Sequence, residues 1–200
     1  METINLNESL LLGEGRHKVV YAHPTDSRKC IKIMKDSLDT ELERELKYHR
    51  ALARRGKKLS MLVEYYGEVE TNFGKGYLFE RVMDYTGETS RELSFVLDNP
   101  AETQKLLGCT TEDVLHRFHD MLLEQKLVVS NIDSYNYMIQ LLSPTKYTIR
   151  AIDNIGTPAH VPLAYYFDFL ALKHIKKYWA RFAKRYSEKY PGIFPKDLLK

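Results

Sequence analysis

Two polar side chains lie at the borders of apolar runs and carry the oxygen atoms that divalent cations prefer. Asp153 ends the run YTIRAID, and Asn136 lies in LVVSNIDSYNYMI (127–139), where a polar loop separates two apolar segments. Hard cations such as Mg²⁺ bind carboxylate and amide oxygens. Asp153 and Asn136 are therefore candidate metal ligands, with the alternative that Asp153 only closes a turn.

A lysine in the middle of an apolar run is a second candidate for chemistry. Lys32 occupies the centre of CIKIM, a segment typical of a strand. A buried ammonium group needs a counter-charge, because an unpaired charge is costly to remove from water. Glu45 lies beside the apolar stripe of the next helical segment, and Glu41 is a competitor one turn earlier. Alternatively, Lys32 lies on an edge strand and both glutamates are solvated.

Two glycines interrupt a pair of strand-like runs near the start of the chain. Gly13 and Gly15 lie in LLGEGRHKVVY. Glycine lets the backbone approach a ligand closely and point its N–H groups at phosphate oxygens. The pattern indicates a phosphate-binding loop, although an ordinary hairpin turn is the more frequent origin of such a pair.

These side chains require a mixed scaffold of strands and helices to bring them together. The periodicity and turn residues predict strand, turn and strand over 9–34, a helix from a cap at Asp36 or Ser37 to Gly56, a hairpin around TNFGKG (71–76), a helix over 102–126, a hairpin from MIQLL and YTIRAI, and a last helix over about 164–188. The result is a β-rich first portion with one helix, followed by a mostly helical portion that carries a small hairpin.

Length and composition place the chain among ordinary globular proteins. Its 200 residues, 44% hydrophobic and 28% charged, fit one domain or a close pair of lobes. The start METINLNESLLL lacks the features of a signal peptide, and no apolar run approaches the roughly 18 residues that span a bilayer. Cys30 and Cys109 are too few for a disulfide framework or a zinc site. We therefore expect a reduced, cytoplasmic protein.

The C-terminal segment is strongly basic. Nine lysines and arginines from Lys173 to Lys200 face only Glu188 and Asp197, so this segment carries +7 in a chain of net charge +3. Its apolar stripe predicts a helix packed on the core, and the basic face is then either solvated or bound to an anionic membrane surface. Nucleic acid is a disfavoured partner, because no aromatic platform motif or reading helix accompanies the charge.

A pair of histidines offers a separate metal site. His116 and His119 are three residues apart in the predicted helix over 102–126, with Asp113 and Asp120 nearby. Imidazole and carboxylate groups on one helix face bind transition metals. Surface or partly packed histidines are the commoner origin of such spacing.

The order of these parts resembles that of protein-kinase-like phosphotransferases. A glycine loop, a strand lysine, a helix glutamate, a hairpin, a helix, a polar loop with asparagine and a strand-end Asp-x-x-Gly follow one another. GEGRHKVV resembles the glycine-rich loop, with Lys18 in place of its third glycine. LFERVMD resembles the last strand of the small lobe and its hinge, and DNIG resembles the metal-binding segment.

The chain also resembles the YrbL family of the PhoP regulatory network over about residues 9–185. The resemblance is carried by LLGEGRHKVVYAHPTDSRKCIKIMK, RELKYHRALARRG, YYGEVETNFGKGYLFE and DNIGTPAHVPLA. It implies a compact kinase-like protein tied to an envelope-stress or cation-sensing regulon, with an unidentified phosphoryl acceptor.

Together, the two resemblances imply an α+β, minimal two-lobed kinase-like fold that binds ATP and Mg²⁺. The β-rich lobe covers residues 1–82, and a reduced helical lobe covers 83–200. The implied roles are ATP binding by Gly13, Gly15, Lys32, Glu45 and Glu80, and metal binding by Asn136 and Asp153.

The polar loop departs from the kinase pattern at the catalytic base. If Asn136 is the metal-binding asparagine, the expected aspartate falls on Asn131, whose amide orients a hydroxyl but cannot take up its proton. Asp133 faces the same side of an extended loop, so it is the candidate base, with Asn131 as an orienting group. The alternative is a pseudokinase that acts as a regulatory binding module. Only 44 residues follow Gly156, too few for the subdomain that grips peptide substrates, so an open site is expected.

Overall fold

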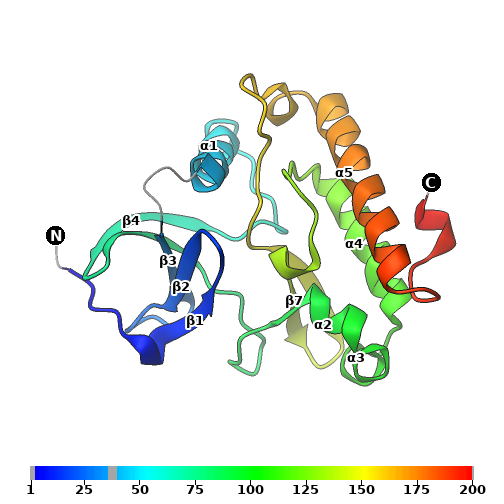
Figure 1. Cartoon of the computed structure of the whole chain (residues 1–200), viewed down its shortest axis with the longest axis horizontal. Helices are drawn as coiled ribbons and strands as arrows, with labels where there is room; N and C mark the ends of the chain where they lie inside the picture. The colour runs from blue at the N-terminus through cyan, green and yellow to red at the C-terminus, as the bar shows by residue number, and fades with distance from the viewer. Residues whose placement is uncertain (1–2, 36–39, 200) are drawn as a thin grey trace.

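A computed structural model describes residues 3–35 and 40–199, and its two antiparallel sheets lie in different halves of the chain (Figure 1). The N-terminal region contains β1 (Leu11–Glu14), β2 (Lys18–Ala22), β3 (Lys29–Met34), α1 (Thr40–Arg54), β4 (Tyr65–Thr71) and β5 (Gly74–Glu80). The C-terminal region contains β6 (Arg91–Glu92), α2 (Leu93–Asp98), α3 (Pro100–Leu107), α4 (Thr111–Gln125), β7 (Tyr137–Ser143), β8 (Lys146–Ala151) and α5 (Asp168–Lys189). Short 3₁₀ turns occupy Glu8–Leu10, Ser134–Asn136, Leu163–Tyr165 and Lys196–Leu199. The fold class is α+β, as the sequence predicts.

Strand β3 lies at the centre of the five-stranded sheet, whose order is β1-β2-β3-β5-β4. Successive side chains of a strand point to opposite faces. Ile31 and Ile33 pack with Leu6 on one face, whereas Cys30 packs with Leu42 of α1 on the other. Both faces of β3 are therefore covered, which accounts for its nearly continuous apolar run and for the burial of Lys32.

Helix α1 packs its apolar stripe against this sheet and ends as predicted. Leu42 and Leu46 are buried, and Gly56 beyond the end has a φ of +60° and donates its N–H to the Ala53 carbonyl at 3.0 Å. A left-handed glycine after the last turn is a common helix stop. The predicted cap at Asp36 or Ser37 lies outside the described residues.

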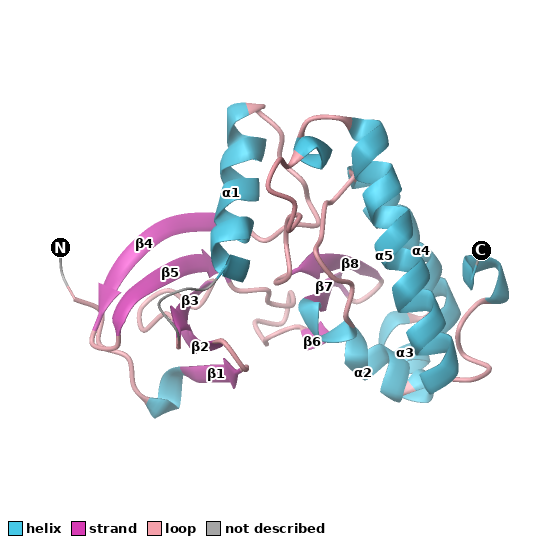
Figure 2. Cartoon of the chain, turned by 45° about the horizontal axis from the view of Figure 1, so that its top comes forward, coloured by secondary structure: helices cyan, strands magenta, loops and turns pink. Residues whose placement is uncertain are grey.

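The second sheet supports a helical layer in the C-terminal region. Its order is β6-β7-β8, and Ile139 of β7 lies opposite Ile149 of β8. Helices α4 and α5 run side by side (Figure 2), with Phe118 packed edge-to-face on Trp179 and Phe182. Both predicted hairpins, β4–β5 and β7–β8, are confirmed.

The prediction of one helix over residues 102–126 is wrong. Gly108 adopts a φ of +69° and ends α3, and Thr110 then caps α4 through a reciprocal capping box with Asp113. The last helix begins at Asp168 instead of near residue 164, because Leu163–Tyr165 forms a separate 3₁₀ turn. The short α2 and β6 were not predicted.

No helix among residues 3–35 and 40–199 combines the length and the apolar character that crossing a membrane requires.

Candidate functional site

A cleft of about 450 Å³ lies between the two sheets and brings most of the candidate residues together. Six of them line it: Gly13, Gly15, Lys32, Glu80, Asn136 and Asp153. Glu45 lies behind Lys32, and neither Asn131 nor Asp133 is among the lining residues. The cleft therefore unites residues that are up to 140 positions apart in the chain.

Gly13 lies in β1 and Gly15 in the turn between β1 and β2, and both line the cleft. Gly15 donates its N–H to the Lys18 carbonyl at 2.9 Å, so the segment is also an ordinary hairpin. A Cβ added at Gly13 would meet no protein atom within 4 Å. Nothing in the protein itself requires glycine at position 13, and the space beside it belongs to the cleft.

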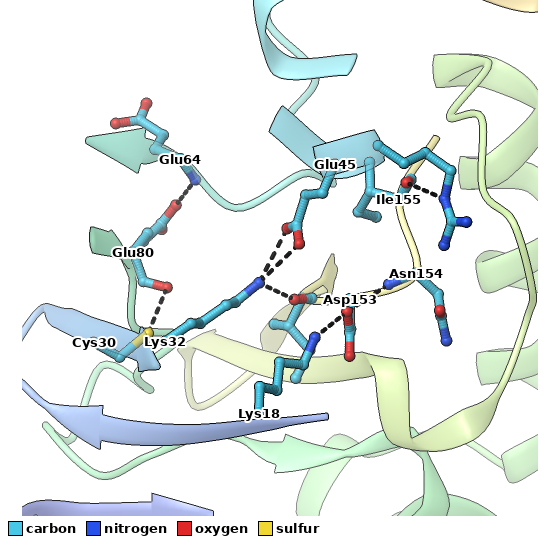
Figure 3. Close-up of polar contacts among 11 residues, drawn as sticks. Lys18, Cys30, Lys32, Glu45, Glu64, Glu80, Asp153, Asn154 and Ile155 are labelled. Atoms are coloured by element: carbon cyan, nitrogen blue, oxygen red, sulfur yellow. Dashed lines mark hydrogen bonds and ion pairs between the residues drawn. The ribbon is translucent and has the colours of Figure 1, made fainter. Parts of the chain in front are cut away.

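Lys32 and Glu45 form a buried ion pair at the back of the cleft (Figure 3). The Lys32 ammonium lies 3.0 and 3.1 Å from the two carboxylate oxygens of Glu45, and the residues are 4% and 1% exposed. Glu45 is thus the partner of Lys32, whereas the competing Glu41 is half-buried one turn earlier. Strand β3 and helix α1 are joined through this pair.

Lys32 also connects the N-terminal sheet to the strand end that carries Asp153. Its ammonium donates to the Ile152 carbonyl at 2.9 Å and lies 3.8 Å from the centre of the Phe79 ring. Burial opposes the charge on Lys32, but the carboxylates of Glu45 and Asp153 outweigh it and raise the Lys32 pKa. Lys32 is therefore charged and is surrounded by acceptors from both regions.

Asp153 has a partner that the sequence did not reveal. The Lys18 ammonium reaches across the cleft from β2 to the Asp153 carboxylate (Figure 3). Burial favours the neutral acid, but the charges of Lys18 and Lys32 outweigh it and lower the Asp153 pKa. The available signal was a lysine in the expected place of the loop's third glycine.

Backbone contacts hold the segment after Asp153 against the polar loop. Ser130 donates its N–H to the Asn154 carbonyl at 2.8 Å, and Gly156 donates to the Val128 carbonyl at 2.8 Å. Gly156 has a φ of +90°, and a Cβ there would collide with the Tyr165 hydroxyl. Glycine is therefore required at position 156 by both conformation and space.

Asn136 meets the requirements of a ligand-binding side chain. It is 8% exposed and lines the cleft, yet its Nδ2 has no hydrogen-bond partner among the described residues. Its backbone carbonyl accepts from the N–H of Ile152, which places it beside the Asp153 segment. Its amide oxygen and the Asp153 carboxylate are the kinds of donor atom that hard divalent cations bind.

The candidate base Asp133 is engaged with helix α5. Its carboxylate lies 3.1 Å from the Arg185 guanidinium and accepts from the Tyr186 hydroxyl at 3.2 Å. It also accepts from the Tyr135 N–H at 3.3 Å. Asn131 is exposed. The sequence placed Asp133 and Asn131 at the reacting centre, but the structure places both outside the cleft lining.

Glu80 and Cys30 mark the end of the cleft where β3 and β5 meet. The Glu80 carboxylate accepts from Arg150 at 2.5 Å and from the Glu64 N–H at 3.0 Å, so it connects β5 to β8. Its backbone N–H donates to the Glu64 carbonyl at 2.8 Å, and its carbonyl accepts from the Cys30 thiol at 3.7 Å. Burial raises the pKa of the Cys30 thiol to about 11, which leaves little thiolate at neutral pH.

The predicted histidine pair separates into two environments. His116 lies 3.6 Å from Asp197 and 3.9 Å from Glu112, and one ligand atom from each of the three falls within 4.8 Å of the others. His119 instead packs on Trp179, with ring centres 4.5 Å apart. The two histidines do not share a site.

The fold and the cleft define an α+β protein with a charged cleft between two antiparallel sheets. The chain belongs to the family described as PhoP regulatory network protein YrbL, whose family model matches residues 4–187. The YrbL proteins of Escherichia coli (strain K12) and Shigella flexneri are each 32% identical to it over 182 residues. These alignments cover 90% of this chain and 86% of each relative.

Proposed function

We propose that the chain is a minimal two-lobed, kinase-like protein that binds ATP and Mg²⁺ in the cleft between its sheets. The observation that carries this proposal is the buried Lys32–Glu45 pair, which also holds the backbone next to Asp153. A fully buried ion pair is a costly feature, since desolvation offsets most of its attraction. Its location at the wall of a cleft favours a binding role over a purely structural one.

The charges of the cleft suit a polyphosphate and a metal. Lys18 and Lys32 supply two ammonium groups, and the space beside Gly13 admits a phosphate chain. Asn136 and Asp153 would hold the cation, which supplies charge neutralisation at the phosphate oxygens. In this proposal Lys32 also orients Asp153 through the Ile152 carbonyl.

The apolar end of the same cleft suits a nucleotide base. The lining there includes Val20, Val63, Val82 and Met138. A flat aromatic base fits between such side chains, and Glu80, Arg81 and Val82 also line the cleft. The acceptor of the phosphoryl group is an unidentified molecule in a PhoP-linked response to envelope stress or cations, a context that the family description supports.

Titration of the chain with ATP, with and without Mg²⁺, tests nucleotide binding by calorimetry. We expect Mg²⁺-dependent binding that is weakened at least about tenfold in Lys32→Met/Glu45→Met, which removes both charges and leaves neither buried alone. Lys29→Met is the matched control, because Lys29 lies on the same strand and pairs with Asp26 at the surface. Equal affinity in all three proteins contradicts the proposal.

One observation favours a second function, a pseudokinase that binds nucleotide and acts as a regulatory module. The Asp133 carboxylate contacts Arg185 and Tyr186 of helix α5 and is not among the residues that line the cleft. Single-turnover assays with γ-labelled ATP separate the two functions. Label transfer or hydrolysis above the level of Asp153→Ala supports the kinase, and nucleotide binding without either supports the pseudokinase.

A further inference from the structure

Five large apolar side chains are exposed within nine residues, between β8 and the first turn of α5. Val161, Leu163, Tyr166, Phe167 and Phe169 are 47–67% exposed, and we call residues 161–169 the apolar edge. Scattered surface apolar residues are ordinary, whereas a contiguous group marks an interaction site. Neither the packing of the core nor the cleft uses these side chains.

Cations from the end of α1 border the apolar edge on one side. The Arg55 guanidinium donates to the Tyr165 carbonyl and lies 6.0 Å from the centre of the Tyr166 ring. Lys57 lies 3.5 Å from Asp168, the one carboxylate within the edge. Lys126 neutralises the same carboxylate from α4 at 3.1 Å. The edge therefore carries no uncompensated negative charge.

Helix α5 continues the edge as a basic stripe on its exposed side. One face carries Phe169, Lys173, Lys176, Lys177 and Lys184. All five are exposed, and the lysines follow Phe169 at helical spacings of four, seven, eight and fifteen residues. The opposite face packs into the core through residues such as Phe182. The lysines are thus free of core contacts and face solvent together with an exposed aromatic ring.

Figures 1 and 2 both place α1, the Leu163–Tyr165 turn and the start of α5 at the top of the molecule. Apolar side chains flanked by cations on both sides have the composition of a membrane-interface surface. Phenylalanine and leucine enter the boundary between headgroups and acyl chains, while lysine and arginine attract anionic lipids. The apolar residues gather at one end instead of alternating with the lysines, which suits insertion of a tip more than stacking of nucleic-acid bases.

We propose that the apolar edge, with Arg55, Lys57 and the lysines of α5, docks on an anionic phospholipid bilayer. Phe167 and Phe169 enter the interface, and Lys173, Lys176 and Lys177 lie over the headgroups. The edge begins eight residues after Asp153, on the stretch of chain that leaves the cleft. The proposal does not depend on what the cleft binds.

Flotation of the full chain with vesicles tests this surface. Vesicles of phosphatidylcholine alone and with about 30% phosphatidylglycerol serve as probes, at two salt concentrations. We expect binding to the anionic vesicles that weakens with salt, because exposed charges are screened. Lys173→Gln/Lys177→Gln reduces the affinity about fivefold per lysine, and Phe167→Asp/Phe169→Asp abolishes binding.

Matched variants on the β7–β8 hairpin serve as controls. Leu142→Asp introduces one negative charge at a 52% exposed apolar position, and Lys146→Gln removes one exposed lysine. Both controls retain wild-type binding, and thermal unfolding verifies that every variant is folded. The proposal is overturned if the wild type does not float, if the controls lose as much binding as the edge variants, or if the edge variants alter binding only to an oligonucleotide or an acidic protein.

Discussion

At the scale of single residues, Lys32 and Glu45 form the most deeply buried ion pair among the described residues. Its ammonium and the Glu45 carboxylate are both almost fully removed from water. Each charge is tolerated because the other lies about 3 Å away. Removing one partner therefore leaves a buried charge without a counter-charge, whereas removing both does not.

Substituting Lys32 alone should destabilise the fold more than substituting the pair. We expect Lys32→Met to lower the free energy of unfolding by about 3–5 kcal/mol, because the Glu45 carboxylate is left buried without a counter-charge. Lys32→Met/Glu45→Met should recover most of this loss. Urea denaturation at pH 7 measures both effects, and a single variant as stable as the wild type would contradict the description of the pair.

Lys18 forms an ion pair with the Asp153 carboxylate, the group that would bind a divalent cation. Under the proposed function, a cation binding at Asp153 competes with the Lys18 ammonium for the same oxygen atoms. We expect Lys18→Met to bind Mn²⁺ at least about fivefold more tightly than the wild type in the absence of nucleotide. Mn²⁺ titration followed by electron paramagnetic resonance measures the affinity, and Lys29→Met is the control. An unchanged affinity argues against a metal at Asp153.

The sequence predicts the components of the site better than their pairing. Burial of Lys32 and the choice of Glu45 follow from local patterns, namely an apolar strand and a helical stripe. The contacts of Asp153 with Lys18 and of Asp133 with Arg185 join residues 135 and 52 positions apart. Such contacts depend on how the two regions pack, which no local pattern encodes.

At the scale of elements, helix α1 buries a histidine against the N-terminal sheet. His49 lies about 6 Å from the rings of Tyr65 and Phe79, and its Nε2 has no hydrogen-bond partner among the described residues. Burial and the charge of Lys32 lower the His49 pKa to about 4. The neutral imidazole is therefore the form that packs against the sheet.

This shift makes the stability of the α1–sheet contact depend on pH. The unfolded chain takes up a proton at His49 near pH 6.5 and the folded chain only near pH 4, so protonation favours unfolding as the pH falls through this window. We expect a loss on the order of 2–3 kcal/mol between pH 7 and pH 4 from this residue. His49→Phe should flatten that part of the curve, measured by urea denaturation at a series of pH values. If the stability of His49→Phe changes with pH as much as that of the wild type, other groups cause the pH dependence.

Element boundaries show where sequence patterns succeed and where they do not. The hairpins carry apolar strand-like runs joined by turn residues, TNFGKG in β4–β5 and SPTK in β7–β8, which are local signals. The segment 102–126 keeps an apolar helical periodicity across Gly108, so periodicity alone hides the break. The decisive features are the left-handed glycine and the Thr110–Asp113 capping box, both of which concern single residues.

At the scale of the whole molecule, the two regions share a hydrophobic core that includes Tyr48 and Met61 of the N-terminal region, and polar contacts around the cleft add to it. Arg150 of β8 binds Glu80 of β5, and Ala151 donates its N–H to the Met61 carbonyl at 2.6 Å. Lys32 adds its bond to Ile152. Three consecutive residues, Arg150 to Ile152, thus bind the N-terminal region immediately before Asp153.

The Lys32–Ile152 hydrogen bond lies at the start of the segment that runs from the cleft to the apolar edge. Any occupant that draws the Lys32 ammonium away from that carbonyl loosens the anchor of the segment leading to residues 161–169. Coupling between two binding sites is reciprocal. A cleft ligand would change the affinity of the apolar edge for a bilayer by the same factor by which the bilayer changes the affinity of the cleft for that ligand.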